Sequence, residues 1–266
     1  MKLEKLIESA AAQGEVEGLE ELLGRARAHL ATELKYERRP EAAVGVAKSP
    51  LGDLLVAMTG AGVALIHYLT DGRDLAETIA KIRCELDLVE DARAVKSISD
   101  EIRRYLAGEA SALRQKIDLR LATSPFHQKV LHKLREVPRG AVISYQALGA
   151  AVGAPKGARA VGNAMHANPL PIYVPCHRVI ASGGRLGGYG GGAGRKLRLL
   201  RSEGFVLSGD ATKLPDHSVW GHRGTNIFCR NSCPSAARVD PSRILTFATP
   251  KDARRAGMHP CKICRP

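Results

Sequence analysis

A cysteine and a histidine stand next to each other in an apolar, β-branched run, where residues 172–180 read IYVPCHRVI. A thiolate is a strong nucleophile, but an ordinary thiol pKa near ~8.5 leaves it scarce at neutral pH, and apolar surroundings raise that pKa further. A histidine that takes the thiol proton, directly or through water, offsets this cost. Neighbouring residues of a strand face opposite sides, so Cys176 and His177 cooperate only if the chain turns, as Pro175 favours. A small buried hydrophobe is the alternative interpretation of this cysteine.

A glycine-dense loop follows, with residues 183–194 reading GGRLGGYGGGAG around a single aromatic residue, Tyr189. Such a loop can fold closely around a flat ligand and offer it backbone donors and acceptors; a flexible linker is the alternative. The loop matches neither the G-x-G-x-x-G dinucleotide motif nor a Walker G-K-[ST] motif. It leads into a helix predicted over 195–204, which is closed by Glu203, one of only two acids in residues 122–206.

Four of the six cysteines form two close pairs near the C-terminal end, Cys229 with Cys233 and Cys261 with Cys264, with 27 residues between the pairs. Two short pairs that flank a small insert suit tetrahedral Zn²⁺ with four thiolate ligands, in a reducing compartment rather than in a disulfide framework. The spacing therefore predicts a zinc ion and, by itself, no particular reaction. Cys84, in a predicted helix, is interpreted as a small buried hydrophobe.

The formal net charge of +13 is concentrated in the second half of the chain. Residues 1–121 have a net charge of −3, residues 122–206 carry +10 and residues 207–266 carry +6. This concentration predicts a polyanionic partner, with nucleic acid as the first candidate. An anionic membrane surface is the weaker alternative, because no basic amphipathic helix with bulky apolar anchors is present. No apolar run reaches the ~20 residues of a membrane span and no signal-peptide core is found, so we expect a soluble, cytoplasmic protein.

The first third of the chain has regular patterns but no evident chemistry. Residues 1–35 have the spacing of two amphipathic helices, interpreted as a packing or oligomerisation extension. Residues 44–70 hold apolar runs separated by S-P-L-G and G-A-G turns and predict a hairpin. Residues 74–86 and 97–106 have helical spacing.

Residues 124–167 predict an arrangement of helices that is typical of DNA-binding proteins. Ser124 is a good N-cap before a proline, and a helix over 145–152 and a helix over 156–167 flank a glycine-containing turn, which resembles a helix-turn-helix. The last helix is nearly bare, with Arg159 as its one long projecting side chain. Such a surface fits close packing against another element or close approach of a DNA backbone, and the local charge favours DNA.

These motifs together resemble a known family. Residues 122–206 resemble the DNA-binding half of the O6-alkylguanine-DNA alkyltransferases, which move an alkyl group from guanine to their own cysteine. The resemblance is carried by PRGAVISYQAL, ARAVGNAM, ANPLPIYVPCHRVI, the Gly-Tyr-Gly loop and LLRSEG. Residues 44–115 are similar, more weakly, to the family's N-terminal half. Gly190 stands where many relatives have serine, and Tyr173 replaces the usual aliphatic residue, which leaves the range of accepted alkyl groups open.

The resemblance implies a role for each residue of a catalytic set. Cys176 is the expected alkyl acceptor, and His177 is expected to deprotonate it through a bound water. Glu203 would orient and polarise the histidine, and Asn168 would brace the link between the recognition helix and the active-site segment. An S-alkyl thioether is a poor leaving group, so each molecule is expected to act once.

The resemblance also implies a set of DNA contacts. A base inside a duplex is sterically blocked, so the target must be flipped out at a cost of a few kcal/mol. Tyr145 is expected to help by acting on the phosphate backbone, Arg159 to fill the gap in the stack, and Tyr189 to contact the flipped guanine. Ala158 and Gly162 belong to the small-residue helix, which the family places in the minor groove.

The cysteine-rich segment resembles the metal-binding domain of the bacterial adaptive-response (Ada) protein, through TNIFCRNSCPSAA and AGMHPCKICRP. In that domain a zinc-bound thiolate accepts methyl groups from DNA phosphotriesters, and Cys229 is the matching position. Here the segment follows the alkyltransferase and is short upstream of Cys229. Structural zinc with DNA docking is therefore favoured over a second methyl-transfer site.

The sequence thus predicts an α+β protein with a helical extension (1–40), a ribonuclease-H-like N-terminal domain (41–120), a catalytic DNA-binding domain (121–207) and an Ada-like zinc module (217–266). We expect a single-turnover methylated-DNA–[protein]-cysteine S-methyltransferase that acts on O6-alkylguanine in double-stranded DNA, with O4-alkylthymine as a further candidate substrate. Zn²⁺ is the expected cofactor, with no organic cofactor, and the expected location is the prokaryotic nucleoid. The alternatives are a non-catalytic sensor of alkylated DNA, against which Cys176 argues, and a methylation-responsive regulator, for which no promoter-reading domain is evident.

Overall fold

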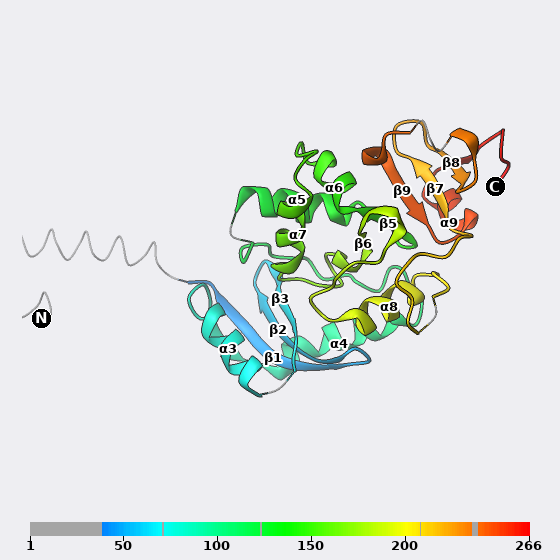
Figure 1. Ribbon diagram of the computed structural model, residues 1–266. Coiled ribbons are helices and arrows are strands. Elements are labelled where there is room, and N and C mark those ends of the chain that lie inside the picture. Colours follow the sequence, from blue (N-terminus) through cyan, green and yellow to red (C-terminus); the bar gives the residue numbers. More distant parts are fainter. Residues whose placement is uncertain (1–38, 71, 123, 208, 236–238) are drawn as a thin grey trace, which may run out of the picture. The chain divides into compact units, whose positions relative to one another are not determined.

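The computed structural model describes residues 39–70, 72–122, 124–207, 209–235 and 239–266 (Figure 1). The two helices predicted within residues 1–35 lie outside the described residues. From Glu41 onward the chain forms one compact unit, which contains two β-sheets and the helices that cover them. The predicted α+β class is confirmed. Among the described residues, none of the helices is both long enough and apolar enough to cross a membrane.

A four-stranded sheet with the order β3-β2-β1-β4 forms the N-terminal half. Its elements are β1 (Glu41–Ser49), β2 (Gly52–Thr59), β3 (Gly62–Tyr68), α3 (Gly72–Ile82), β4 (Asp87–Glu90) and α4 (Ala92–Leu106). The first three strands are antiparallel, as the turn spacing predicts, and β4 pairs with β1 in parallel. Helix α4 packs against β1 and starts earlier than predicted, because the carboxylate of Asp91 caps its first backbone N–H groups.

The prediction that Cys84 is buried is wrong. Helix α3 ends at Ile82, and Cys84 lies in the turn that follows, exposed to solvent. The buried positions around this turn are taken by Ile82 and Leu86. The helix predicted over 74–86 therefore extends too far at its C-terminal end, where the chain forms a turn instead.

The second half holds the predicted helix-turn-helix and the active-site segment. Its elements are α5 (Pro125–Arg135), β5 (Ala141–Ser144), α6 (Tyr145–Ala151), α7 (Ala158–His166), the 3₁₀ turns η1 (Cys176–Arg178) and η2 (Ser182–Gly184), β6 (Val179–Ile180) and α8 (Ala193–Ser202). Ser124 caps α5 and Ser144 caps α6, each through a hydrogen bond from a backbone N–H three residues on. The two caps fix where these helices begin, close to the predicted positions.

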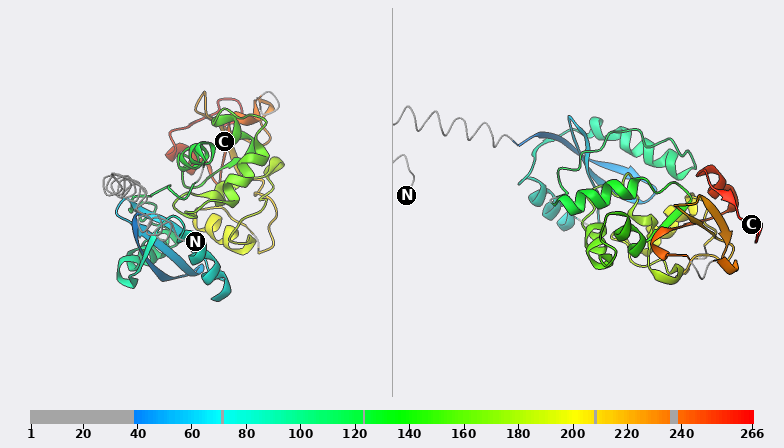
Figure 2. Two further views of the ribbon diagram at one scale, coloured as in Figure 1. Left: turned by 90° about the vertical axis from the view of Figure 1, so that its left-hand side faces the viewer. Right: turned by 90° about the horizontal axis from the view of Figure 1, so that it is seen from above.

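The cysteine-rich segment adds strands to the sheet of the second half. Its elements are β7 (Val219–His222), β8 (Ile227–Arg230), η4 (Pro241–Arg243), β9 (Ile244–Phe247), α9 (Pro250–Arg255) and β10 (His259–Pro260). The resulting six-stranded sheet has the order β10-β8-β7-β9-β5-β6, so β9 pairs directly with β5. Figures 1 and 2 show this segment, coloured orange to red, beside the green part of the chain that contains β5.

One hydrophobic core extends across this shared sheet. Phe228 and Phe247, from the cysteine-rich segment, are fully buried in the same cluster as Ile143, Val179 and Cys176. This sharing was not predicted from the sequence. The domain boundaries given above for residues 41–266 stay a prediction.

Candidate active site and metal centre

The chain turns at Cys176, as cooperation between the thiol and the next residue requires. Pro175 precedes the 3₁₀ turn η1, which begins with Cys176. The thiol is 8% exposed, and Asn168 Nδ2 donates a hydrogen bond to its Sγ at 3.1 Å. The same Nδ2 donates to the Val174 carbonyl at 3.0 Å, while Asn168 Oδ1 accepts from the Leu170 backbone N–H at 3.0 Å. Asn168 therefore ties the end of α7 to the active-site segment.

His177 and Glu203 form a buried pair behind the thiol. The imidazole is completely buried, and its Nε2 lies 2.6 Å from Glu203 Oε1. Burial lowers the pKa of His177, and the neighbouring carboxylate opposes this. The imidazole is held neutral, and its Nε2–H donates a hydrogen bond to Glu203 Oε1. The second nitrogen, Nδ1, is buried and has no hydrogen-bond partner among the described residues. It is the nitrogen that can take up a proton.

Glu203 is the C-cap residue of α8, and its carboxylate accepts several further hydrogen bonds. Arg178 Nε donates to its Oε2 at 2.9 Å and Arg178 Nη2 to its Oε1 at 3.0 Å. The hydroxyl of Tyr105 donates to Oε1, and the Gly140 backbone N–H donates to Oε2 at 3.4 Å. Burial disfavours the carboxylate, but its interactions with His177 and Arg178 outweigh burial and hold the pKa of Glu203 well below its ordinary range. The acid is therefore ionised throughout the physiological pH range.

Tyr105 and Lys196 belong to this site and were missed from the sequence. Tyr105 comes from α4 of the N-terminal half, and no local signal marks it. Lys196 is 2% exposed and its Nζ donates to the carbonyls of Val179 at 2.7 Å, Gly188 at 3.1 Å and Leu186. Burial lowers the pKa of Lys196 to about 8, and the Cys176 thiolate opposes this shift. A buried lysine thus anchors the glycine-rich loop to β6.

The environment of Cys176 sets its acidity. Burial raises the pKa of the thiol, while the Asn168 hydrogen bond and then the Lys196 ammonium group act in the opposite direction. The thiol is therefore protonated at neutral pH until a base removes the proton. His177 Nδ1, which is buried and has no hydrogen-bond partner among the described residues, is available to take up this proton.

A cavity of about 370 Å³ opens in front of the thiol. It is lined by Tyr145, Gly162, Met165, His166, Cys176, Gly188, Tyr189 and Gly190. A Cβ added at Gly162, Gly188 or Gly190 would meet nothing within 4 Å. Packing within the protein therefore does not require these glycines, and their bare surface is open to a ligand.

The predicted site residues fall into two groups. Cys176, Tyr145, Gly162 and Tyr189 line the cavity, and Asn168 is hydrogen-bonded to the Cys176 sulfur. His177 follows Cys176 in the chain and pairs with Glu203. Arg159 and Ala158 lie outside the cavity, in the first turn of α7, where the Arg159 side chain is exposed. This outward position is compatible with a contact to DNA rather than to the flipped base.

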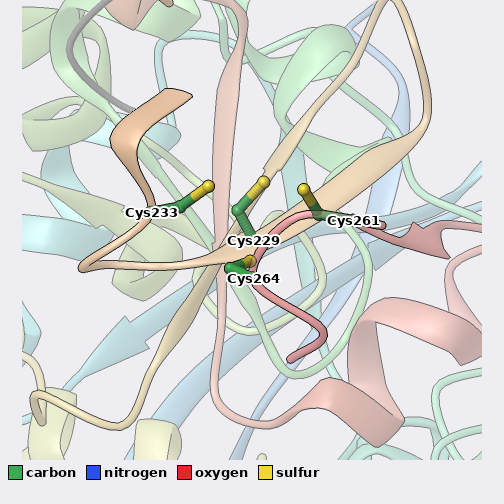
Figure 3. Close-up of side chains that lie close together, drawn as sticks. All are labelled: Cys229, Cys233, Cys261 and Cys264. Carbon is green, nitrogen blue, oxygen red and sulfur yellow. The ribbon is translucent and has the colours of Figure 1, made fainter.

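The four C-terminal cysteines converge, and all their sulfurs lie within 4.8 Å of one another (Figure 3). Cys229 lies in β8, Cys233 in the turn after it, and Cys261 and Cys264 follow β10. Tetrahedral zinc with Zn–S bonds of ~2.3 Å places its sulfurs about 3.8 Å apart, a separation that falls within the 4.8 Å spread of this cluster. The four residues therefore fit a metal ion with thiolate ligands, and their backbone is held by a hydrogen bond from the Cys261 N–H to the Phe228 carbonyl at 2.9 Å.

A second cavity, of about 670 Å³, reaches this cluster. Cys229 and Cys261 form part of its wall, together with Trp220 and the exposed apolar side chains of Ile227 and Ile263. The cluster is therefore buried on its inner side and can be approached from one outer side.

Comparisons with known proteins agree with both sites. The family model described as "6-O-methylguanine DNA methyltransferase, DNA binding domain" matches residues 125–205, and "Metal binding domain of Ada" matches residues 206–266. The methylated-DNA–protein-cysteine methyltransferase of Salmonella typhimurium is 40% identical over 137 residues, which cover 51% of this chain and 80% of that protein. Its counterpart in Mycobacterium tuberculosis is 38% identical over 164 residues, 62% of this chain and 93% of that protein.

A solved structure gives the same result. The crystal structure of the O6-methylguanine methyltransferase of Mycobacterium tuberculosis matches with a TM-score of 0.51 and 34% identity, over 61% of this chain and 92% of that chain. The relatives are thus matched over most of their length, and the predicted resemblance is confirmed. The chain belongs to the family of methylated-DNA–protein-cysteine methyltransferases, which repair DNA by alkyl transfer, and it carries an Ada-type metal-binding domain after the alkyltransferase.

Proposed function

We propose that Cys176 is the residue that accepts the alkyl group, from O6-alkylguanine in double-stranded DNA. The observation that carries this assignment is the buried thiol at the wall of the 370 Å³ cavity, with a neutral histidine behind it whose Nδ1 is free. A non-catalytic sensor of alkylated DNA has no use for a buried thiol that is backed by a base and its carboxylate. Alkyl transfer therefore accounts for these residues better than sensing does.

We propose the following reaction for these groups. The thiol proton passes to His177 Nδ1, directly or through a water, and the carboxylate of Glu203 stabilises the imidazolium that forms. Sγ then attacks the alkyl carbon, a sulfur–carbon bond forms, and the bond from that carbon to guanine O6 breaks. The electron pair stays on the guanine, which takes up a proton. The thioether does not leave again, so one molecule repairs one base.

The same geometry supports DNA as the partner. The helix-turn-helix of α6 and α7 borders the cavity, and residues 122–206 carry a net charge of +10. In this proposal Tyr189 contacts the flipped guanine, and Tyr145, which also lines the cavity, helps to flip it by acting on the phosphate backbone. Arg159, on the exposed first turn of α7, fills the gap left in the stack. We propose O4-alkylthymine as a second substrate, since the cavity is open enough to admit it. Because chromosomal DNA is the proposed substrate, we also propose a location in the cytoplasm, on the nucleoid.

Intact-protein mass spectrometry tests the acceptor. After incubation with a duplex that contains one O6-methylguanine, we expect a mass gain of one methyl group, mapped to the peptide of Cys176. The exposed thiol of Cys84 is an internal control and stays unmodified. An unmodified duplex gives no gain. Binding of the damaged duplex without any mass gain would identify a sensor and sink the proposal.

For the C-terminal cluster we propose Zn²⁺ as the ion held by Cys229, Cys233, Cys261 and Cys264. When bound, zinc keeps the thiols deprotonated and supplies folding free energy. Stabilisation of the segment and docking on DNA form its primary role in this proposal.

One observation favours a second candidate function for this cluster, methyl transfer from a DNA phosphotriester to Cys229. The 670 Å³ cavity leads from solvent to this thiolate position along an apolar wall. In this reaction the methyl carbon moves to Sγ and the phosphodiester anion leaves. Cys176→Ala protein and an oligonucleotide with one methylphosphotriester provide the test. A methyl group on the Cys229 peptide supports this function, and no mass gain in residues 207–266 ends it.

A further inference from the structure

The phenol of Tyr189, which lines the cavity, is held by a residue of the N-terminal half. Tyr68, the last residue of β3, is 8% exposed, and its hydroxyl lies 2.9 Å from the Tyr189 hydroxyl. The two rings meet edge to face, with centroids 6.2 Å apart and an interplanar angle of 64°. A buried tyrosine hydroxyl needs a hydrogen-bond partner, and in the described part of the chain Tyr189 provides it.

Arg195 holds this pair of tyrosines against the glycine-rich loop. Its guanidinium lies 4.7 Å above the centre of the Tyr68 ring. Its Nε donates to the Leu51 carbonyl at 2.6 Å and its Nη1 to the Gly191 carbonyl at 2.9 Å. A Cβ at Gly191 would lie 2.6 Å from an atom of each tyrosine ring, so only glycine lets the loop fold this closely. The loop is therefore anchored to β3 and to the β1–β2 turn at a defined place.

Tyr189 also lies beside the reacting thiol. The two residues line the same cavity, and the interaction with Tyr189 lowers the pKa of Cys176 against the larger effect of burial. Burial raises the pKa of Tyr68 and of Tyr189, so both phenols are protonated at physiological pH. In the hydrogen bond between these two hydroxyls, only one of the two hydrogens lies between the oxygens. If Tyr68 donates to the Tyr189 oxygen, the Tyr189 hydrogen is left to point into the cavity.

We propose that Tyr68 is a positioning residue for alkyl transfer, which directs the Tyr189 hydroxyl toward Cys176 and the target base. A phenol that accepts a hydrogen bond is a stronger donor, so Tyr68 also strengthens the bond that Tyr189 gives. Hydrogen bonding to the charged form favours it, so this donor stabilises the thiolate as it forms. The inference rests on the proposed function of Cys176 as acceptor. The inference gives Tyr68, a residue of the N-terminal half, a role in the reaction.

Tyr68→Phe tests this directly, because it removes only the hydroxyl and keeps the ring under Arg195. We expect the single-turnover rate of methyl transfer at pH 7, at saturating O6-methylguanine duplex, to fall about 5- to 10-fold, since one hydrogen bond is worth ~1 kcal/mol. The pH at which the rate reaches half its maximum moves upward, because the hydrogen bond that stabilises the thiolate is weaker. The Kd for the duplex is unchanged. A residue that only stabilised the fold would not move the pH midpoint.

A double-mutant cycle shows whether Tyr68 acts through Tyr189. In a Tyr189→Phe background, Tyr68→Phe is expected to change the rate less than 2-fold, since the hydroxyl that it directs is gone. Thr59→Val is the matched control. It removes another buried hydroxyl of the N-terminal half, which donates to Asp118 at 2.6 Å, and it leaves the pH midpoint unchanged.

The outcomes separate the two proposals. If wild-type protein gains no methyl group, the function proposed for Cys176 fails. If wild-type protein reacts and Tyr68→Phe has the wild-type rate and pH midpoint, only the role of Tyr68 is overturned. An equal loss of rate in the wild-type and Tyr189→Phe backgrounds also overturns it.

Discussion

Glu203→Gln is expected to slow methyl transfer at least ~100-fold and to lower the free energy of unfolding by about 3 kcal/mol at pH 7. The amide keeps the size of the side chain but loses the charge that balances Arg178 and stabilises protonated His177. General-base catalysis is typically worth ~10²–10⁴ in rate. Removal of one partner from a buried ion pair leaves the other charge uncompensated, at a cost of ~3–5 kcal/mol. Single-turnover kinetics and urea unfolding measure the two effects.

The effect on stability has a defined dependence on pH. His177 and Arg178 outweigh burial and hold the pKa of Glu203 in the folded protein well below its ordinary value near ~4.3. As the pH falls below that value, the unfolded chain takes up a proton at Glu203 and the folded protein does not. The stabilisation is therefore complete above about pH 5 and declines by up to ~1.4 kcal/mol for each pH unit below ~4.3. The unfolding curves of wild type and Glu203→Gln should converge in this acid range.

Glu136→Gln is the matched control, because Glu136 is the only other acid in residues 122–206. Its side chain is 57% exposed and pairs with Lys133 at the surface. An exposed pair of this kind contributes ~0–1 kcal/mol, and Glu136 is not among the residues that line the cavity. Equal rates for Glu203→Gln and Glu136→Gln would contradict the role given to Glu203.

Local sequence was enough to predict the elements that carry the reaction. Ser124, Ser144 and the turn glycines mark helix boundaries through short-range hydrogen bonds, so the helix-turn-helix could be placed within a few residues. The Cys-His pair, Pro175 and Glu203 lie in short motifs with specific flanks. The turn at Cys176 could be predicted because adjacent residues of a strand face opposite sides. Cys176 and His177 could therefore cooperate only if the chain turned at this point.

Contacts between distant segments could not be predicted in the same way. Tyr105 reaches Glu203 across 98 residues of chain, and Tyr68 reaches Tyr189 across 121. Each is a single tyrosine in an ordinary helix or strand, so its type and spacing carry no sign of its partner. Lys196 was placed in a helix, but only the fold shows that its ammonium group is enclosed by carbonyl oxygens.

The pairing of β9 with β5 is the third long-range feature, and it joins the cysteine-rich segment to the half of the protein that contains the active site. Ala141, Val142 and Ile143 pair with Phe247, Thr246 and Leu245, so the cysteine-rich segment covers an edge of the strand that leads into the helix-turn-helix. Gly140 is hydrogen-bonded both to the cysteine-rich segment and to Glu203 of the active site. Its carbonyl accepts from the Ala248 N–H at 3.0 Å, and its own N–H donates to Glu203. The cysteine-rich segment is thus part of the support of the active site.

Removal of the metal is therefore expected to destabilise the alkyltransferase as well as the cysteine-rich segment. A small four-thiolate segment loses much of its folding free energy without its ion. When β9 detaches, burial of Leu245 and Phe247 is lost, at ~1.5–3 kcal/mol for each side chain, together with the β5–β9 hydrogen bonds. A loss of at least ~3 kcal/mol lowers Tm by about 10 °C for a domain of this size.

Calorimetry of zinc-loaded and chelator-treated protein, and of Cys233→Ala, provides the measurement. We expect one cooperative transition in the loaded protein, which moves to lower temperature in both other samples, and faster hydrogen exchange at Ala141–Ile143. Cys84→Ala is the control, since it removes an exposed cysteine outside the cluster and leaves Tm and its response to zinc unchanged. If chelation melts residues 207–266 alone, while the main transition and the exchange of β5 stay as in the loaded protein, the segment is an independent domain. In that case the shared sheet contributes nothing to the stability of the active site.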